Sequence, residues 1–326
     1  MKVLVTGATG FIGSHLVEAL LQTGVDVRCL VRRSSHLTWL GKLPVEFVCG
    51  DCSDPVSLVE PVKGVDQVFH LAGVTKAARE KTYDEVNALG TENLIRACLT
   101  HNPHLLKFIY LSSQAAAGPC QNGGRKRESD LCEPVSPYGR SKRKGEELAL
   151  AQAHKLPLII LRPSAVYGPR EKDIYTYIRL LSKRIMPVFS GKDQRISLCY
   201  VLDVVQALLK AAEKEAPGGE IFFLSDGHDY RAEDVGQAFA QAMGVSPVRI
   251  PVPTWIIHGI ATCSEVISSL SGHPALINRG KVEEMLQQHW LCDITKARTA
   301  LRFEPRVSLA EGARLTVDWY RKENWL

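Results

Sequence analysis

Short runs of apolar, often β-branched residues alternate with amphipathic stretches through the first half of the chain. Such runs are typical of strands buried on both faces of a parallel sheet, and they occupy residues 2–6, 26–31, 45–49, 65–72, 106–113 and 157–163. Helical periodicity lies between them, over 12–23, 83–99 and 137–154. Strands that alternate with crossover helices predict a doubly wound, parallel α/β sheet with helices on both faces.

The alternation loosens after Pro163. Residues 197–214 and 219–225 have the pattern of a return to the sheet, and from Tyr230 onward the chain is mostly helical. We therefore expect two domains. The first consists of residues 1–163 and about 196–226 and contains the sheet. The second consists of about 164–195 and 227–326, is smaller and mostly helical, and lies over the carboxyl ends of the strands, where such sheets bind ligands.

Composition excludes several classes of protein. The chain has 326 residues, of which 45% are hydrophobic and 23% are charged, as in ordinary globular proteins. Its formal net charge is only +5, and acids follow the basic clusters at 124–130 and 139–147, so no nucleic-acid partner is expected. The apolar stretch 252–270 is interrupted by His258 and Glu265, so no transmembrane segment is predicted.

Cysteine usage and the N-terminus indicate the compartment. The nine cysteines have no repeating spacing, which is typical of reduced thiols in a cytoplasmic protein. Cys49 and Cys52 form a close pair without a second pair of ligands, so no metal site is predicted. The chain enters a strand at once, unlike a signal peptide. Peripheral contact with a membrane is compatible with this picture if the substrate is a lipid.

Three glycines stand between the first strand and the first helix. The sequence "VTGATGFIG" places Gly7, Gly10 and Gly13 there with the spacing G-x-x-G-x-x-G. Gly7 permits a tight turn, Gly10 lets the backbone approach a pyrophosphate, and Gly13 lets the helix pack closely on the strand. Because a strand precedes the triplet and a helix follows it, the pattern predicts that the first domain binds a dinucleotide.

A second group of residues indicates acid–base chemistry. The sequence "SPYGRSK" places Tyr138 and Lys142 four residues apart at the start of a helix, so both face the same way. An ammonium beside a phenol favours the phenolate, and an oxidised nicotinamide adds positive charge, so we expect the pKa of Tyr138 to fall toward working pH. The preceding strand ends in Ser112 and Ser113, whose hydroxyls can hydrogen-bond a substrate oxygen.

In these motifs the chain resembles the extended short-chain dehydrogenases/reductases, the superfamily that includes NAD-dependent epimerases and dehydratases. The resemblance covers essentially the whole chain and extends to "HLAG" (70–73), "VNALGTENLI" (86–95) and "LRPSAVYGP" (161–169). It implies an enzyme with a Rossmann-type fold. Alignment with the family's strand places the catalytic serine at Ser113, at a family-like separation from Tyr138.

The resemblance also implies the roles of individual residues. Tyr138 passes a proton to or from the substrate oxygen, Ser113 orients that oxygen, and Lys142 lowers the pKa of Tyr138 and holds the nicotinamide ribose. Residues implied to contact the cofactor lie in the glycine loop, after the second and third strands, at 71–73, on the central helix and beside the nicotinamide. They are Gly7, Thr9, Gly10, Phe11, Ile12, Gly13, Arg32, Arg33, Ser35, Asp51, Cys52, Leu71, Ala72, Gly73, Asn87, Tyr138, Lys142, Pro163, Ser164 and Val166. The family often forms homodimers through helices around 83–101 and 137–154, so we expect a homodimer.

Several substrate classes are compatible with the resemblance. Nucleotide-sugar epimerases and dehydratases generally carry an asparagine just before a "VYGP"-like turn, where this chain has Ser164 and Ala165. The motifs look more like the 3β-hydroxysteroid dehydrogenase and dihydroflavonol reductase branch, which interconverts secondary alcohols and ketones on bulky apolar substrates. Apolar residues of the C-terminal region would then line the substrate pocket or form helix core: Trp255, Ile256, Ile257, Ile260, Val266, Ile267 and Leu270. A nucleotide-sugar epimerase is the alternative, followed by a non-enzymatic NADP-sensing protein, a class that typically lacks the tyrosine or the lysine.

The segment after the second strand favours NADP as the cofactor, with NAD as the alternative. In the family's pattern the acid that binds both ribose hydroxyls falls at Val31, and valine cannot accept a hydrogen bond. Arg32, Arg33 and Ser35 follow, and a guanidinium binds a phosphate through two parallel hydrogen bonds. We expect Arg32 to make this contact, because Arg33 would point to the opposite side if the strand continued.

Overall fold

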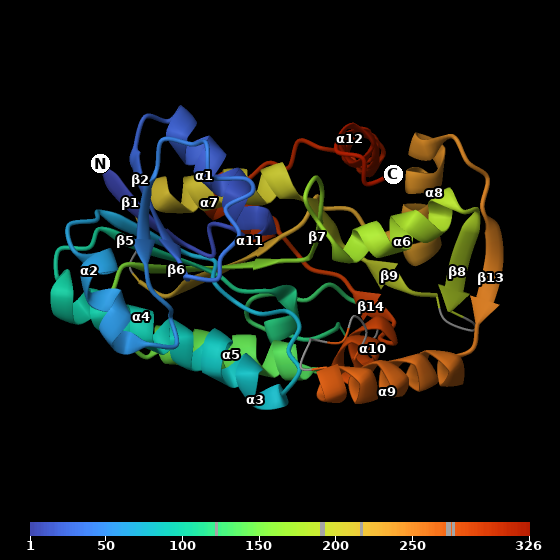
Figure 1. Ribbon diagram of the computed structural model, residues 1–326, viewed down its shortest axis with the longest axis horizontal. Coiled ribbons are helices and arrows are strands. Elements are labelled where there is room, and N and C mark those ends of the chain that lie inside the picture. Colours follow the sequence, from blue (N-terminus) through green and yellow to red (C-terminus); the bar gives the residue numbers. More distant parts are fainter. Residues whose placement is uncertain (121–122, 190–192, 216–217, 272–274, 276–277) are drawn as a thin grey trace.

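Seven parallel strands form the central sheet in the computed structural model, which describes residues 1–120, 123–189, 193–215, 218–271, 275 and 278–326 (Figure 1). In spatial order the strands are β11 (Glu220–Leu224), β6 (Leu158–Pro163), β5 (Lys107–Leu111), β4 (Gln67–His70), β1 (Lys2–Thr6), β2 (Asp26–Val31) and β3 (Glu46–Cys49). The strand order reverses between β1 and β4, which is where such sheets bind dinucleotides. The predicted doubly wound, Rossmann-type sheet is confirmed.

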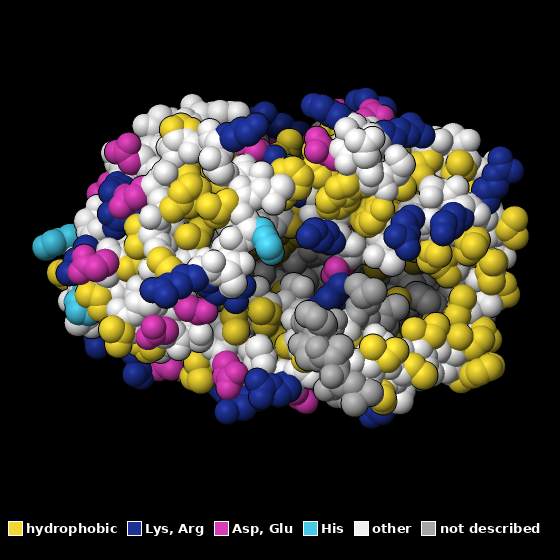
Figure 2. All heavy atoms as spheres, viewed as in Figure 1, with side chains coloured by type: hydrophobic (Ala, Val, Ile, Leu, Met, Phe, Trp, Pro, Cys, Tyr) yellow, Lys and Arg dark blue, Asp and Glu magenta, His cyan; other side chains and the backbone are white. Residues whose placement is uncertain are grey.

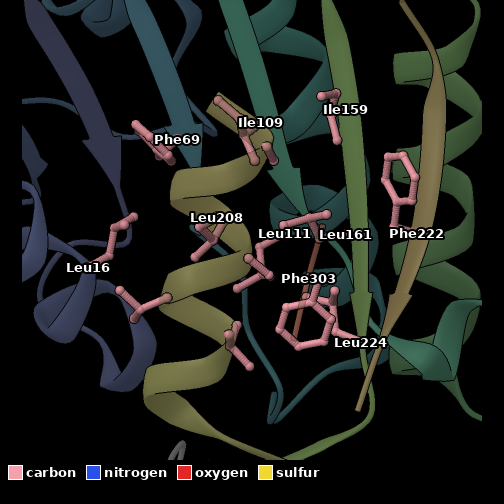
Figure 3. Close-up of a cluster of buried hydrophobic side chains, with 14 of the residues drawn as sticks. Leu16, Phe69, Ile109, Leu111, Ile159, Leu161, Leu208, Phe222, Leu224 and Phe303 are labelled. Carbon is pink, nitrogen blue, oxygen red and sulfur yellow. The ribbon is translucent and has the colours of Figure 1, made fainter. Parts of the chain in front are cut away.

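Helices cover both faces of the sheet because its strands are apolar on both sides (Figure 1). On one face lie α1 (Phe11–Gln22), α7 (Val201–Glu213) and α11 (Thr295–Leu301), and on the other α2 (Val59–Val62), α4 (Gly90–His101) and α5 (Pro137–Leu150). Figure 3 shows Leu16 of α1 and Leu208 of α7 against Phe69 and Ile109 of the sheet. Shorter turns are η1 (Pro55–Leu58), α3 (Glu80–Tyr83), the π-helical η2 (Asp84–Leu89) and η3 (Gln114–Ala116).

The remaining elements lie at one end of the sheet (Figure 1). Their helices are α6 (Asp173–Ser182), α8 (Ala232–Met243), α9 (Thr254–Ser271), α10 (Arg279–Met285) and α12 (Leu309–Lys322). Three small sheets accompany them. They pair β7 (Ala165–Tyr167) with β10 (Leu198–Tyr200), β8 (Ile185–Phe189) with β13 (Val248–Val252), and β9 (Arg195–Ile196) with both β12 (Tyr230–Arg231) and β14 (His289–Trp290).

Two segments depart from the expected arrangement. Residues 197–214 and 219–225 were both expected to return to the sheet. The second segment does so, because its strand β11 pairs with β6 at the edge of the sheet. The strand of the first segment, β10, pairs with β7 outside the sheet. Near the C-terminus, Cys292, Leu301 and Phe303 pack into the core under the central sheet. The chain therefore returns to the sheet after α10.

A buried ion pair joins α5 to the sheet. Glu146 of α5 is 0% exposed and Arg162 of β6 is 1% exposed. Arg162 Nε donates to Glu146 Oε1 at 2.9 Å and Nη2 donates to Oε2 at 2.6 Å. Because the pair is two-pronged and dry, it fixes both the position of α5 along β6 and its rotation about its own axis.

Loss of one partner should therefore cost much more than loss of both. We expect Arg162→Met to lower the free energy of unfolding by about 3–5 kcal/mol, because it leaves the Glu146 carboxylate buried with only the longer contact to Arg143 at 3.6 Å. Urea denaturation followed by circular dichroism measures this. The double variant Arg162→Met with Glu146→Leu should recover most of the loss, and a double variant less stable than the single one would contradict the interpretation.

Candidate active site

The glycine turn forms a cradle at the end of β1. Gly7 has a φ of 69°, and a Cβ there would lie 2.6 Å from the backbone carbon of Leu71. A Cβ on Gly13 would lie 2.1 Å from the oxygen of Gly7, and the N–H of Gly10 donates to that same oxygen at 3.0 Å. Helix α1 starts at Phe11 with no acid in its first turn and no side-chain cap among the described residues. Its free N–H groups and close backbone fit a pyrophosphate.

Residues after β2 and β3 stand beside this cradle. Strand β2 ends at Val31, and a tight turn follows in which the N–H of Arg32 donates to Ser35 Oγ at 3.0 Å and the N–H of Ser35 donates to Arg32 O at 2.9 Å. Both Arg32 and Arg33 are exposed and form no ion pair with any residue that the structure describes. Asp51 accepts hydrogen bonds from the backbone N–H and the hydroxyl of Ser53.

The expected reason for preferring Arg32 does not hold, because Arg33 lies in a turn and not in a continuing strand. A different observation separates the two arginines. Burial raises the pKa of the Cys52 thiol to about 12, and the neighbouring Arg32 opposes that rise electrostatically. The charge of Arg32 therefore lies near Cys52, a residue expected on the adenosine side.

Ser113, Tyr138 and Lys142 meet at the carboxyl end of β5. Ser136 caps α5, Pro137 begins it, and Tyr138 and Lys142 follow one turn apart. Ser113 follows β5 and lies close enough to the Tyr138 side chain to favour its phenolate. Lys142 Nζ donates to Leu111 O at 2.8 Å and lies 4.4 Å from the ring centroid of Tyr110. The structure thus brings Ser113 and Tyr138 together, and directs Lys142 to the end of β5.

The expected fall in the pKa of Tyr138 is wrong for the protein without cofactor. Burial raises the pKa of Tyr138, Glu284 and Tyr83 add to the rise, and Ser113 opposes it. Lys142 is directed to the carbonyl of Leu111, and burial lowers its own pKa to about 7. The phenol of Tyr138 is thus held in its protonated form.

Several other residues expected to contact the cofactor lie at the carboxyl edge of the sheet. Gly73 lies beside Lys142, and Ser164 follows β6 with a buried hydroxyl that, like that of Ser112, has no hydrogen-bond partner among the described residues. Unpartnered buried hydroxyls at the sheet's carboxyl edge fit a polar group of a ligand. Pro163 ends β6 and Val166 lies in β7, also at this edge.

Asn87 has a different environment, because it is wholly buried. Its Oδ1 accepts from Val74 N at 2.8 Å, and its Nδ2 donates to Val74 O at 3.0 Å and Ser141 Oγ at 2.9 Å. The side chain therefore joins the loop after β4 to α5. Its amide positions the walls of the site through contacts within the protein.

Two residues in or beside α10 reach the site although no motif in the sequence pointed to them. Asn278 Nδ2 donates to Tyr83 Oη at 3.1 Å, and the rings of Tyr83 and Tyr138 lie edge to face with centroids 6.5 Å apart. Glu284 accepts a hydrogen bond from Ser136 at the start of α5. No local pattern around 278–284 indicates these contacts, since they depend on how the two domains pack.

A glycine cradle at the reversal point of a parallel sheet, with serine, tyrosine and lysine at the same edge, defines a nicotinamide-dependent dehydrogenase, reductase or epimerase. Residues 3–224 match the NAD dependent epimerase/dehydratase family, and the chain belongs to that family. Its relatives are NAD(P)-dependent dehydratases, reductases and epimerases, and the chain is an enzyme of this class.

Relatives along the whole chain have different activities. The chain is 32% identical to a ceramide reductase of Caulobacter vibrioides, over 99% of this chain and 96% of the relative. It is 28% identical to a UDP-glucose 4-epimerase of Vibrio cholerae, over 99% and 96% of the two chains. Among solved structures, MoeE5 in complex with UDP-glucuronic acid and NAD has a TM-score of 0.79 at 26% identity, covering 99% of this chain and 100% of that one.

Across the described parts of the chain, no helix combines the length and apolarity that crossing a membrane requires. Within the same residues, no group of three or more His, Cys, Asp or Glu side chains is arranged to hold a metal ion.

The assignment of Tyr138 is testable by removing one atom. We expect Tyr138→Phe to lose nearly all turnover, about 100-fold or more, because the proton donor is gone while the ring still fills its place. Steady-state kinetics measure the loss. The dissociation constant for NADP and the midpoint of thermal unfolding should stay unchanged, and substantial retained turnover would refute the role of Tyr138.

Proposed function

We propose that the protein is an NADP(H)-dependent oxidoreductase that interconverts a secondary alcohol and a ketone on a bulky, apolar substrate, by chemistry at Ser113, Tyr138 and Lys142. The proposal places it closest to the 3β-hydroxysteroid dehydrogenase and dihydroflavonol reductase branch. The observation that carries it is the apolar surface of α9, which packs on α10 next to the start of the catalytic helix.

Helix α9 exposes large apolar side chains along one side. Trp255 is 73% exposed, Ile267 65%, Val266 54% and Ile260 51%, whereas Ile257 is buried against Val282 of α10. Only part of the apolar set noted in the sequence is thus helix core, and the side chain of Leu270 lies outside the described residues. Figure 2 shows hydrophobic side chains gathered over the part of the surface where α9 runs. Exposed apolar side chains gathered in one place favour an apolar ligand.

Names of the relatives support the same substrate class. They include the ceramide reductase, a 2-alkyl-3-oxoalkanoate reductase of Stenotrophomonas maltophilia that is 28% identical, and a farnesyl-dihydroquinoline-oxide ketoreductase of Stigmatella aurantiaca that is 29% identical over 70% of this chain. Nucleotide-sugar chemistry is the second candidate, favoured by the epimerase relative and by the structures with UDP-sugars. Ser164 and Ala165 argue against it, because they replace the asparagine expected in the sugar enzymes.

The geometry suits reduction of a carbonyl. A substrate oxygen between Ser113 and Tyr138 would accept a hydrogen bond from Ser113 and receive the proton of the Tyr138 phenol. The raised pKa of Tyr138 keeps that proton in place until the oxygen becomes basic. The cofactor, when bound, supplies the hydride. Lys142 lies one turn further along α5, beside Gly73. In the proposed reaction it would contact the nicotinamide ribose.

The proposal includes a homodimer through α4 and α5, which lie side by side on one face of the molecule (Figure 1).

Cofactor preference has a direct test. We expect Arg32→Ala to raise the dissociation constant for NADP at least about tenfold, about 1.4 kcal/mol, and to leave that for NAD little changed, because the guanidinium would bind only the 2′-phosphate. Isothermal titration calorimetry measures both constants. Arg33→Ala, which removes the same charge one position along, should have the smaller effect. Equal affinity of the unmodified protein for NAD and NADP would refute the preference.

A substrate panel tests the reaction. We expect the enzyme to oxidise NADPH with ethyl 3-oxodecanoate or a 3-ketosteroid, because both present a carbonyl on an apolar body. UDP-glucose and dTDP-glucose should remain unconverted when they are incubated with the enzyme and NAD or NADP, and chromatography of the products checks this. Conversion of a nucleotide sugar without turnover of any ketone would replace the proposal with the second candidate.

A further inference from the structure

The catalytic helix α5 begins with an incomplete cap. Its N-cap, Ser136, accepts a hydrogen bond from the N–H of Gly139 at 3.0 Å. In a capping box, the residue three places after the cap supplies a Glu or Gln side chain that adds a negative or polar group to the helix start. Here that residue is Gly139, so α5 cannot complete the motif from its own sequence.

Packing against the catalytic serine loop explains the glycine. A Cβ on Gly139 would lie 2.5 Å from the carbonyl oxygen of Ala115, two residues after Ser113. Any side chain at 139 would therefore push α5 away from the turn that carries Ser113. Close approach of Ser113 and Tyr138 excludes a capping acid at this position.

Glu284 of α10 brings a carboxylate to the start of α5, where it binds the hydroxyl of Ser136 and not its backbone N–H. Ser136 Oγ donates to Glu284 Oε1 at 2.5 Å while accepting from Gly139 N, so one hydroxyl joins both groups. The Glu284 side chain is 13% exposed, and its other oxygen lies 3.4 Å from Lys281 Nζ on the same helix. The carboxylate stands at the positive end of α5, whose own first turn contains no acid.

Neighbouring contacts hold α10 in register with α5. A Cβ on Gly280 would lie 2.6 Å from Cδ of Pro137, the first residue of α5, so the two helices touch closely. Asn278 caps α10 by accepting from Lys281 N at 2.8 Å and also bonds Tyr83, whose ring packs on Tyr138. Two direct contacts, from Gly280 and Glu284, and an indirect one through Tyr83 thus join this segment to the start of the catalytic helix.

We infer that Glu284 is a positioning residue of the active site, which completes the cap of α5 from the second domain and thereby fixes Tyr138 against Ser113. This inference rests on the proposed role of Tyr138 as the proton donor.

The placement has an electrostatic consequence. The groups near Tyr138 are Ser113 from the turn after β5, Tyr110 on β5, Tyr83 on α3 and Glu284 on α10, with Lys281 beyond Glu284. Lys142, one turn further along α5, is directed to Leu111 O. The negative charge of Glu284 disfavours the phenolate and so raises the pKa of Tyr138. Removal of that charge should lower the pKa, and reduction, which needs the phenol, should then fail at a lower pH than before.

The test is the pH profile of kcat/KM for NADPH-dependent reduction of ethyl 3-oxodecanoate by the full chain. We expect Glu284→Gln to move the alkaline limb down by about half a pH unit or more, and Glu284→Asp to move it less, because the charge is kept. Glu283→Gln is the matched control, since it removes one charge from an exposed neighbour on the same helix, and its limb should not move. An unmoved limb in Glu284→Gln, or an equal movement in Glu283→Gln, would overturn the inference.

A second measurement needs no substrate. Because Ser136 and Glu284 act as one cap, thermal unfolding of Ser136→Ala, Glu284→Ala and the double variant should be non-additive, with the double variant little less stable than the worse single one. Additive losses would overturn the cap. Tyr138→Phe in the same kinetic assay separates the two proposals. If Tyr138→Phe retains turnover, the proposed function is refuted. If Tyr138→Phe loses turnover but Glu284→Gln leaves the alkaline limb of the pH profile unchanged, only the inference about Glu284 is refuted.

Discussion

The buried pair of Arg162 and Glu146 is the contact on which the geometry of the active site depends. Tyr138, Lys142 and Glu146 follow one another at four-residue spacing, so they form a single stripe along α5. Because Glu146 must face Arg162 in the sheet, Lys142 and Tyr138 are turned toward the carboxyl ends of the strands. A helix anchored only by apolar packing could rotate by part of a turn without losing much buried area. A two-pronged ion pair with no access to water does not permit that rotation.

Close backbone contacts then set how near α5 comes to its neighbours. A Cβ on Gly145 would lie 2.6 Å from the oxygen of Asn87, and Gly139 meets Ala115 in the same way. These contacts bury the catalytic groups, and burial decides their protonation. It lowers the pKa of Lys142 to about 7 and raises that of Tyr138, so the resting site holds a neutral phenol beside an ammonium that loses its proton easily. The chemistry of the site therefore follows from packing as much as from the identity of its residues.

Local patterns in the sequence predicted the parts of the site that depend on near neighbours. The glycine turn, the helix after it and the Tyr138–Lys142 spacing are each properties of a few consecutive residues, and the apolar runs identified the strands of the sheet. Contacts between distant segments had no such signal. The sequence predicts that Asn87 contacts the cofactor, yet its side-chain amide forms hydrogen bonds with Val74 and Ser141. The direction of Lys142 toward Leu111, the pairing of β10 with β7 and the approach of Glu284 to Ser136 likewise depend on tertiary packing, which periodicity does not encode.

The choice between apolar ketones and nucleotide sugars must lie outside the catalytic group. Serine, tyrosine and lysine move a proton to or from an oxygen in either reaction, so their presence favours neither substrate. Two parts of the structure bear on the choice. The two positions before Val166 would contact a polar diphosphate, whereas the surface of α9 would contact an apolar body. Ser164 offers a single small hydroxyl, whereas α9 exposes Trp255 and Ile267. Since α9 packs on α10, and α10 meets the start of α5, an apolar group held there would lie next to the elements that position the reactive tyrosine.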